Sequence, residues 1–201
     1  MLTISIARTT ILTATGIVLA AAMLLTGCST GPAPSPEPPA QGSALEMDEV
    51  AGLDAETIID RLDHTPIGER PTDFTASIRP DTLVLTDTTG TETSVPMPED
   101  RAYVALAPYQ QQTHDCYYHA PTNCIGELRN TDIHVTITDT ETGKAYYDED
   151  TRTFDNGFVG FWLPKGITAT VTVTKGEQTA IGEVSTVAND DATCITTLKF
   201  A

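Results

Sequence analysis

Residues 168–174 have the sequence Thr-Ala-Thr-Val-Thr-Val-Thr, in which apolar and polar side chains alternate at every position. A period of two is typical of a β-strand that buries one face, so Ala169, Val171 and Val173 are expected in a core. Residues 132–138 repeat the pattern, with isoleucine and valine between polar residues. Strands with one buried face are usual in antiparallel sheets, and these two indicate a sheet packed against a second layer.

Similar segments along the chain predict a mainly β protein. Residues 101–201 are expected to form an antiparallel β-sandwich, because short β-prone runs alternate there with turn residues. Residues 44–100 are expected to form a small α+β segment before it, with two short helices within 44–62 and Asp54 as N-cap of the second. The predicted sandwich strands are 102–107, 132–138, 145–148, 158–163, 168–174, 179–185 and 194–200, and those of the α+β segment are 77–79, 82–87 and 92–96.

The run 133–173 resembles transthyretin-like and carboxypeptidase-regulatory-like domains. The resemblance rests on a turn at 139–143, a threonine-rich strand at 151–153 and a glycine-bounded segment with Leu-Pro at 157–166. It implies a β-sandwich and carries no chemistry, because one fold hosts many unrelated functions.

The N-terminus is typical of an exported lipoprotein. Residues 1–27 are expected to be a signal peptide, since one early charge, Arg8, precedes an apolar run too short for a spanning helix. The run ends in Leu25-Thr26-Gly27-Cys28, which resembles the bacterial lipobox and implies lipidation of Cys28. Residues 28–43 are then a proline-rich tether. We expect an extracytoplasmic domain that is held at the cell membrane by its lipid alone.

The net charge of the chain limits the classes of partner that it can bind. The chain has 11 Lys and Arg against 28 Asp and Glu, a net charge of -17. Such a field repels nucleic acid and anionic lipid headgroups and attracts cations. The sequence contains no Gly-rich phosphate loop, His-Glu-x-x-His helix or Gly-x-Ser-x-Gly turn. No catalytic residues are therefore expected.

Candidate metal ligands gather in residues 113–127. This stretch holds His114, Cys116, His119 and Cys124, and folding would have to bring Cys194 to them. Thiolate and imidazole are the ligands that soft and borderline transition metals prefer, so convergence of the three cysteines would suit Cu(I), with Zn(II) as the alternative. If Cu(II) met these thiols, a pair of them could reduce it and close to a disulfide.

A structural account of the same cysteines stays open. Exported proteins commonly contain short-loop disulfides, so Cys116 and Cys124 could pair with no metal involved. Cys194 would then be a small apolar residue on a strand face shared with Leu198 and Phe200. The protein would be a structural or interaction lipoprotein. The odd number of thiols also leaves room for a homodimer.

Several segments resemble the CueP family of extracytoplasmic copper-binding proteins. The resemblance implies a copper site built by Cys116, Cys124 and Cys194, with His114 and His119 as auxiliary ligands. It also implies a role in copper tolerance and copper supply, with a Cu,Zn superoxide dismutase as a client. The segments are Ala-Pro-Tyr at 107–109, Thr-His-Asp-Cys at 113–116, Cys-Ile-Gly-Glu at 124–127, Asp-Asn-Gly-Phe at 155–158, Gly-Phe-Trp-Leu-Pro at 160–164 and Thr-Cys-Ile-Thr-Thr-Leu at 193–198.

Overall fold

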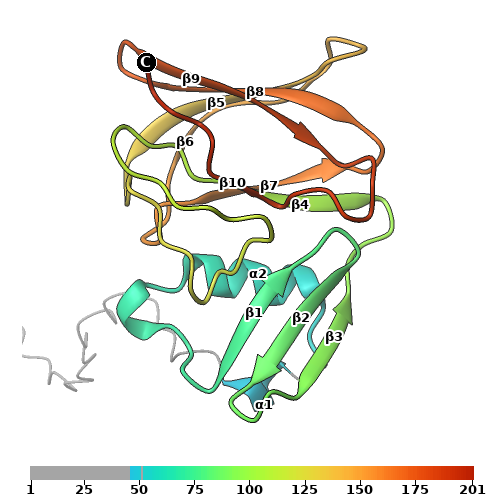
Figure 1. Cartoon of the computed structure of the whole chain (residues 1–201). Coiled ribbons are helices and arrows are strands. Elements are labelled where there is room, and N and C mark those ends of the chain that lie inside the picture. Colours follow the sequence, from blue (N-terminus) through green and yellow to red (C-terminus); the bar gives the residue numbers. More distant parts are fainter. Residues whose placement is uncertain (1–45, 51) are drawn as a thin grey trace, which may run out of the picture. The chain divides into compact units, whose positions relative to one another are not determined.

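The computed structural model describes residues 46–50 and 52–201, so the predicted signal peptide and tether lie outside the described residues. The described part contains α-helices, a short 3-10 helix and strands in three sheets (Figure 1). The predicted fold class, a mainly β protein with a small helical segment before its antiparallel sandwich, is confirmed.

Two sheets face each other to form the sandwich (Figure 1). One has the order β6-β5-β8-β9 and is antiparallel throughout. The other has the order β10-β4-β7. The alternating segments noted in the sequence are β5 and β8, and their apolar side chains fill the space between the sheets. The strands are β4 (Arg101–Leu106), β5 (Asp132–Asp139), β6 (Ala145–Arg152), β7 (Val159–Pro164), β8 (Thr168–Lys175), β9 (Gln178–Ser185) and β10 (Cys194–Ile195).

Strand β4 is buried on both faces. Val104 and Leu106 point into the sandwich core, whereas Tyr103 and Ala105 belong to a second core that contains helix α2. A strand covered on both sides has a continuous apolar run instead of an alternating one, as residues 102–107 do. Because β4 places side chains in both cores, it joins them. Burial of each valine or leucine side chain contributes about 1.5–3 kcal/mol to the free energy of unfolding.

The second core is closed by helices and a small antiparallel sheet. Helix α2 begins after Asp54, whose side chain accepts a hydrogen bond from the Thr57 backbone at 2.8 Å, as predicted. Its apolar stripe packs against the sheet β1-β2-β3 and against β4. No helix in the described part of the chain is long and apolar enough to cross a membrane. The elements are α1 (Met47–Val50), α2 (Ala55–His64), η1 (Ile67–Glu69), β1 (Phe74–Ile78), β2 (Thr82–Asp87) and β3 (Glu92–Pro96).

The C-terminal segment differs from its prediction. Only Cys194–Ile195 form a strand, which pairs parallel to β4, and the rest of the predicted strand is irregular. Its backbone bonds to a loop instead, where Tyr109 exchanges hydrogen bonds with Leu198 and Phe200. Cys194 lies in the helix-containing core, while Leu198 and Phe200 lie in the sandwich core. The prediction that the three share one face was therefore wrong.

Two glycines, Gly126 and Gly157, allow two loops to touch just before the start of β7. A Cβ on Gly157 would lie 2.5 Å from the backbone oxygen of Gly126, and Gly157 has φ +80°. Both features require glycine, because an L side chain is strained at this φ and has no room here. The contact holds residues 124–127 against residues 156–158, since Gly126 also donates to the Asn156 carbonyl at 2.7 Å.

Replacing Gly157 with alanine should destabilise the protein more than the same change at Gly143. Gly143 has φ +71° but open space at its Cβ position, so Gly143→Ala meets only the backbone penalty of about 1–2 kcal/mol. Gly157→Ala meets that penalty and also forces the two loops apart. Urea unfolding of the purified variants measures the difference, and equal losses of free energy of unfolding would contradict the loop contact.

Candidate metal centre

The candidate ligands lie on one long loop and one short strand. Residues 107–131 connect β4 to β5 and carry His114, Cys116, His119 and Cys124. Cys194 begins β10, which pairs with β4. The loop therefore starts and ends on the sandwich while its middle lies against the helix-containing core, where Cys194 also points.

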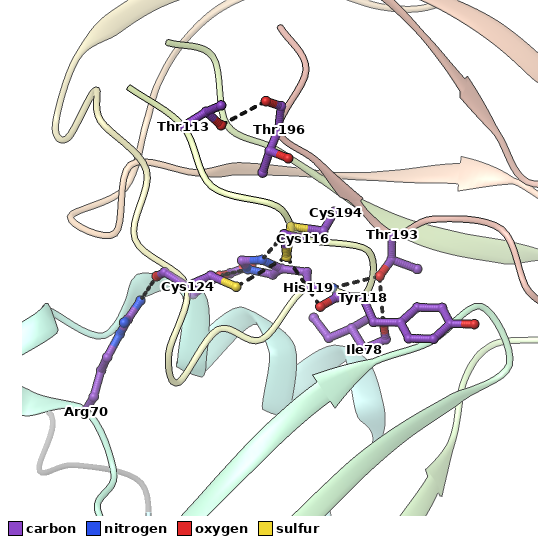
Figure 2. The surroundings of a disulfide bond; sticks show 11 residues. Arg70, Ile78, Thr113, Cys116, Tyr118, His119, Cys124, Thr193, Cys194 and Thr196 are labelled. Atoms are coloured by element: carbon purple, nitrogen blue, oxygen red, sulfur yellow. Dashed lines mark hydrogen bonds and ion pairs between the residues drawn. A yellow bond between two sulfur atoms is a disulfide. The ribbon is translucent and has the colours of Figure 1, made fainter. Parts of the chain in front are cut away.

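Thr193 joins the segments that meet at the site. Its hydroxyl donates to the Ile78 carbonyl of β1 at 2.6 Å and accepts from the His119 backbone at 3.0 Å (Figure 2). Backbone N–H groups of Thr193 and Cys194 both donate to the Tyr117 carbonyl. These hydrogen bonds hold the loop, β1 and the start of β10 together, and the three cysteine side chains therefore lie close to one another.

The sulfur atoms pair differently from the structural account given by the sequence. Cys116 is bonded to Cys194, with 5.6 Å between their Cα atoms, and Cys124 is the free cysteine of the described residues. The Cys116–Cys124 disulfide of the structural alternative is therefore wrong. Cys124 Sγ still lies only 3.4 Å from Cys116 Sγ. The short separation along the chain favoured a bond between Cys116 and Cys124. Folding brings the sulfur atoms of both Cys124 and Cys194 close to that of Cys116.

Two groups of ligand atoms share Cys124. Atoms of His114, Cys116 and Cys124 lie within 4.8 Å of one another, and so do atoms of His119, Cys124 and Cys194. His114 Nε2 is buried without a hydrogen-bond partner among the described residues. A buried ring nitrogen with an unused lone pair or proton is costly unless something binds it. Nitrogen and sulfur donors of both groups thus lie close together around Cys124.

Asp63 is a further residue of the site that sequence reasoning missed. It is 1% exposed and lies 2.8 Å from His119 Nε2. One signal was available, because Asp63 follows Leu62 on the apolar stripe of α2 and lies four residues after the buried Ile59. A carboxylate on the buried face of an amphipathic helix needs a partner inside the protein.

Electrostatics favour a thiolate at Cys124. Burial alone lowers the pKa of His119, but the charge and hydrogen bond of Asp63 outweigh burial and raise it to about 9. Burial raises the pKa of Cys124, yet hydrogen bonding to His119, its positive charge and His114 bring it down to about 7. An imidazolium beside a thiol stabilises the thiolate, which is the form that binds metals.

Arg70, also missed from the sequence, fixes the Cys124 backbone. Its Nη2 donates to the Cys124 carbonyl at 2.8 Å, and Figure 2 shows this side chain reaching the loop from outside the sulfur cluster. Burial lowers the pKa of Arg70, although the negative charges of Asp63 and Cys124 partly offset this effect. An open hollow of about 550 Å³ borders the same loop and is lined by His114 and Cys124, among others. Solvent can reach the free thiol from that side.

Comparisons with known proteins identify the family of the chain. The sequence model of one family, described as periplasmic copper-binding protein CueP, matches residues 57–199. The crystal structure of S.CueP is 32% identical with a TM-score of 0.70, over 77% of this chain and 92% of that one. No curated protein matches the chain. The match to the family covers most of the chain and all five candidate ligands, and the chain belongs to the CueP family of periplasmic copper-binding proteins.

Proposed function

We propose that this protein captures copper through the thiolates of Cys116, Cys124 and Cys194, with His114 and His119 as further ligands. The observation that carries the proposal is the pair of nitrogen and sulfur groups that share Cys124. Soft thiolates favour Cu(I), and mixed thiolate and imidazole donors leave Zn(II) as the alternative ion. Copper is the ion bound by the family.

A purely structural role for the cysteines fits the geometry less well. A disulfide between Cys116 and Cys194 needs no third sulfur, yet Cys124 lies 3.4 Å from it with a lowered pKa. His114 Nε2 is buried without a hydrogen-bond partner in residues 46–50 and 52–201, so this nitrogen is available to a metal. A thiolate and an imidazole nitrogen can both bind a metal, whereas a structural disulfide needs neither of them.

The disulfide suggests how copper reduction would proceed. When Cys116 and Cys194 are both thiolates, each can give one electron to one Cu(II), so that two Cu(II) become two Cu(I) and one S–S bond forms. The Cys116–Cys194 bond is the oxidised product of that step. Cys124, His114 and His119 remain as ligands for a Cu(I) ion. Such reduction is stoichiometric and needs an external thiol reductant to restore the pair.

The sequence and the family support a proposal for the location and partners of the protein. Family members are periplasmic, which supports an extracytoplasmic location. Lipidation of Cys28 would keep this chain at the membrane face, where it serves copper tolerance or supply to copper enzymes. The superoxide dismutase client and the homodimer stay predictions.

Each of the three cysteines should be needed for tight Cu(I) binding by the reduced protein. Cys124→Ser should cause the largest loss, because Cys124 belongs to both ligand groups. We expect Cu(I) affinity to fall by more than the roughly 10–100-fold that follows loss of a residue behind the ligands. Competition with a colorimetric Cu(I) chelator under anaerobic conditions measures it.

Cys28→Ser is the matched control, because it removes a thiol that belongs to the proposed anchor. It should leave Cu(I) affinity unchanged and release the protein from the membrane fraction of cells. Wild-type affinity in all three other Cys→Ser variants would refute the proposed ligands. Retention of Cys28→Ser in the membrane fraction would refute the anchor alone.

Cu(II) added to the reduced protein should consume two thiols and yield two Cu(I) ions for each disulfide formed. Peptide mapping after blocking free thiols should find Cys116 joined to Cys194 and Cys124 alkylated. Loss of all three thiols to mixed products, or Cu(II) that stays oxidised, would contradict the proposed pair of electron donors.

A further inference from the structure

A buried carboxylate lies directly behind the candidate ligand His119. Asp63 Oδ1 accepts from His119 Nε2–H at 2.8 Å and from the Asn156 side chain at 2.9 Å. Asp63 Oδ2 accepts from the Tyr103 hydroxyl at 2.5 Å. Both carboxylate oxygens are thus used, and the carboxylate is held by residues from β4 and from the loop before β7.

The ring of His119 has its other edge toward the sulfurs. Nδ1 lies 4.0 Å from Cys194 Sγ, and Figure 2 shows the ring beside the three sulfur atoms. The Phe158 ring packs against it with 4.4 Å between centroids, and His119 is fully buried. The imidazole is therefore clamped between a carboxylate on one edge and sulfurs on the other.

We infer that Asp63 is a positioning residue of the metal centre: its hydrogen bond with Nε2 turns His119 so that Nδ1 faces the metal held by Cys124 and Cys194. This inference rests on the proposed function, because it assigns a role to a residue that does not itself touch the metal. Histidine ligands commonly donate their second N–H to a carboxylate, which sets the ring orientation and the nitrogen that remains free. This contact leaves Nδ1 to the metal, which takes the place of the Nδ1 proton of the metal-free imidazolium.

The surroundings of Asp63 leave its carboxylate one orientation. The Tyr103 ring lies across Gly160, where a Cβ would overlap its phenol, so the hydroxyl can reach Asp63. Asn156 also donates weakly to the Asp63 backbone carbonyl and accepts from the Phe158 backbone at 2.8 Å. A carboxylate that accepts hydrogen bonds on both oxygens cannot rotate to release His119 without losing several of them.

The inference makes helix α2 part of the metal centre. Asp63 belongs to the penultimate position of α2, outside the sandwich that carries all five candidate ligands. The α+β segment would then do more than cover one face of β4. Copper affinity should depend on a residue that no ligand motif in the sequence contains.

The test compares Asp63→Asn with Asp139→Asn in the reduced protein, using Cu(I) alone as the probe. Asp139 is also buried and accepts from a tyrosine hydroxyl, that of Tyr146 at 3.0 Å, but it lies at the end of β5 among turn residues. Both changes remove a buried charge. Asp63→Asn should lower Cu(I) affinity roughly 10–100-fold, as loss of a partner behind a ligand does, and Asp139→Asn should leave it near the wild-type value.

Nitrogen-15 NMR of the imidazole rings gives a readout that a merely structural role would not change. In wild-type protein, Cu(I) should change the chemical shift of His119 Nδ1, while Nε2 keeps its proton. In Asp63→Asn, the side-chain amide can donate to Nε2, so the proton should move to Nδ1 and the Cu(I)-dependent shift should disappear. The wild-type spectrum decides the matter even if Asp63→Asn does not fold.

The outcomes separate this inference from the proposed function. Cu(I) bound through cysteines without a shift at His119 Nδ1, or equal affinity in the two aspartate variants, would overturn the role of Asp63 and leave the thiolate site standing. A wild-type protein that binds no Cu(I) would overturn both. The inference is supported if Asp63→Asn loses the Cu(I)-dependent shift at Nδ1 and binds Cu(I) more weakly, while Asp139→Asn binds it as the wild type does.

Discussion

The contact between Asp63 and His119 is the constraint on which the arrangement of the site depends. A fully buried carboxylate is unstable without compensation, and this one is satisfied by an imidazolium and two further hydrogen bonds. The carboxylate belongs to α2, and the groups that satisfy it come from β4, the loop before β7 and the loop between β4 and β5. Removing any one of them would leave the buried charge with one hydrogen-bond partner fewer. The ion pair therefore fixes the ligand-bearing loop against the helix-containing core.

The sulfur cluster depends on that placement and on the pairing of β10 with β4. Cys116 and Cys194 are 78 residues apart in sequence, and they meet because Thr193 bonds both to the loop and to β1. Burial of β4 on both faces joins the sandwich core to the helix-containing core at the same place. The candidate metal centre is thus a product of the tertiary structure, since Cys194 reaches the four candidate ligands of the loop only in the folded protein.

Much of the fold could be predicted because its strands bury one face. The alternation in β5 and β8 identified the sandwich, and the side chain of Asp54 identified the start of α2. Strand β6 was predicted too short, since it is an edge strand with mostly exposed side chains and lacks an apolar pattern. The extent of β10 was overestimated, because its alternating apolar residues pack against a loop as irregular backbone.

The candidate ligands were chosen from residue type and family resemblance, and the structure brings them close together, but the bond between two of them could not be predicted. Spacing favoured a bond between Cys116 and Cys124, whereas three-dimensional proximity joins Cys116 to Cys194. Asp63 and Arg70 act through contacts that exist only after folding, so no local motif marks them.

The central claim is that thiolates and an imidazole from separate segments hold one copper ion in the folded protein. X-ray absorption at the copper K-edge of the reduced, Cu(I)-loaded protein tests this claim most directly. The account predicts sulfur scatterers together with the multiple-scattering pattern of at least one imidazole. A first coordination sphere of oxygen and nitrogen alone, without sulfur, would contradict it.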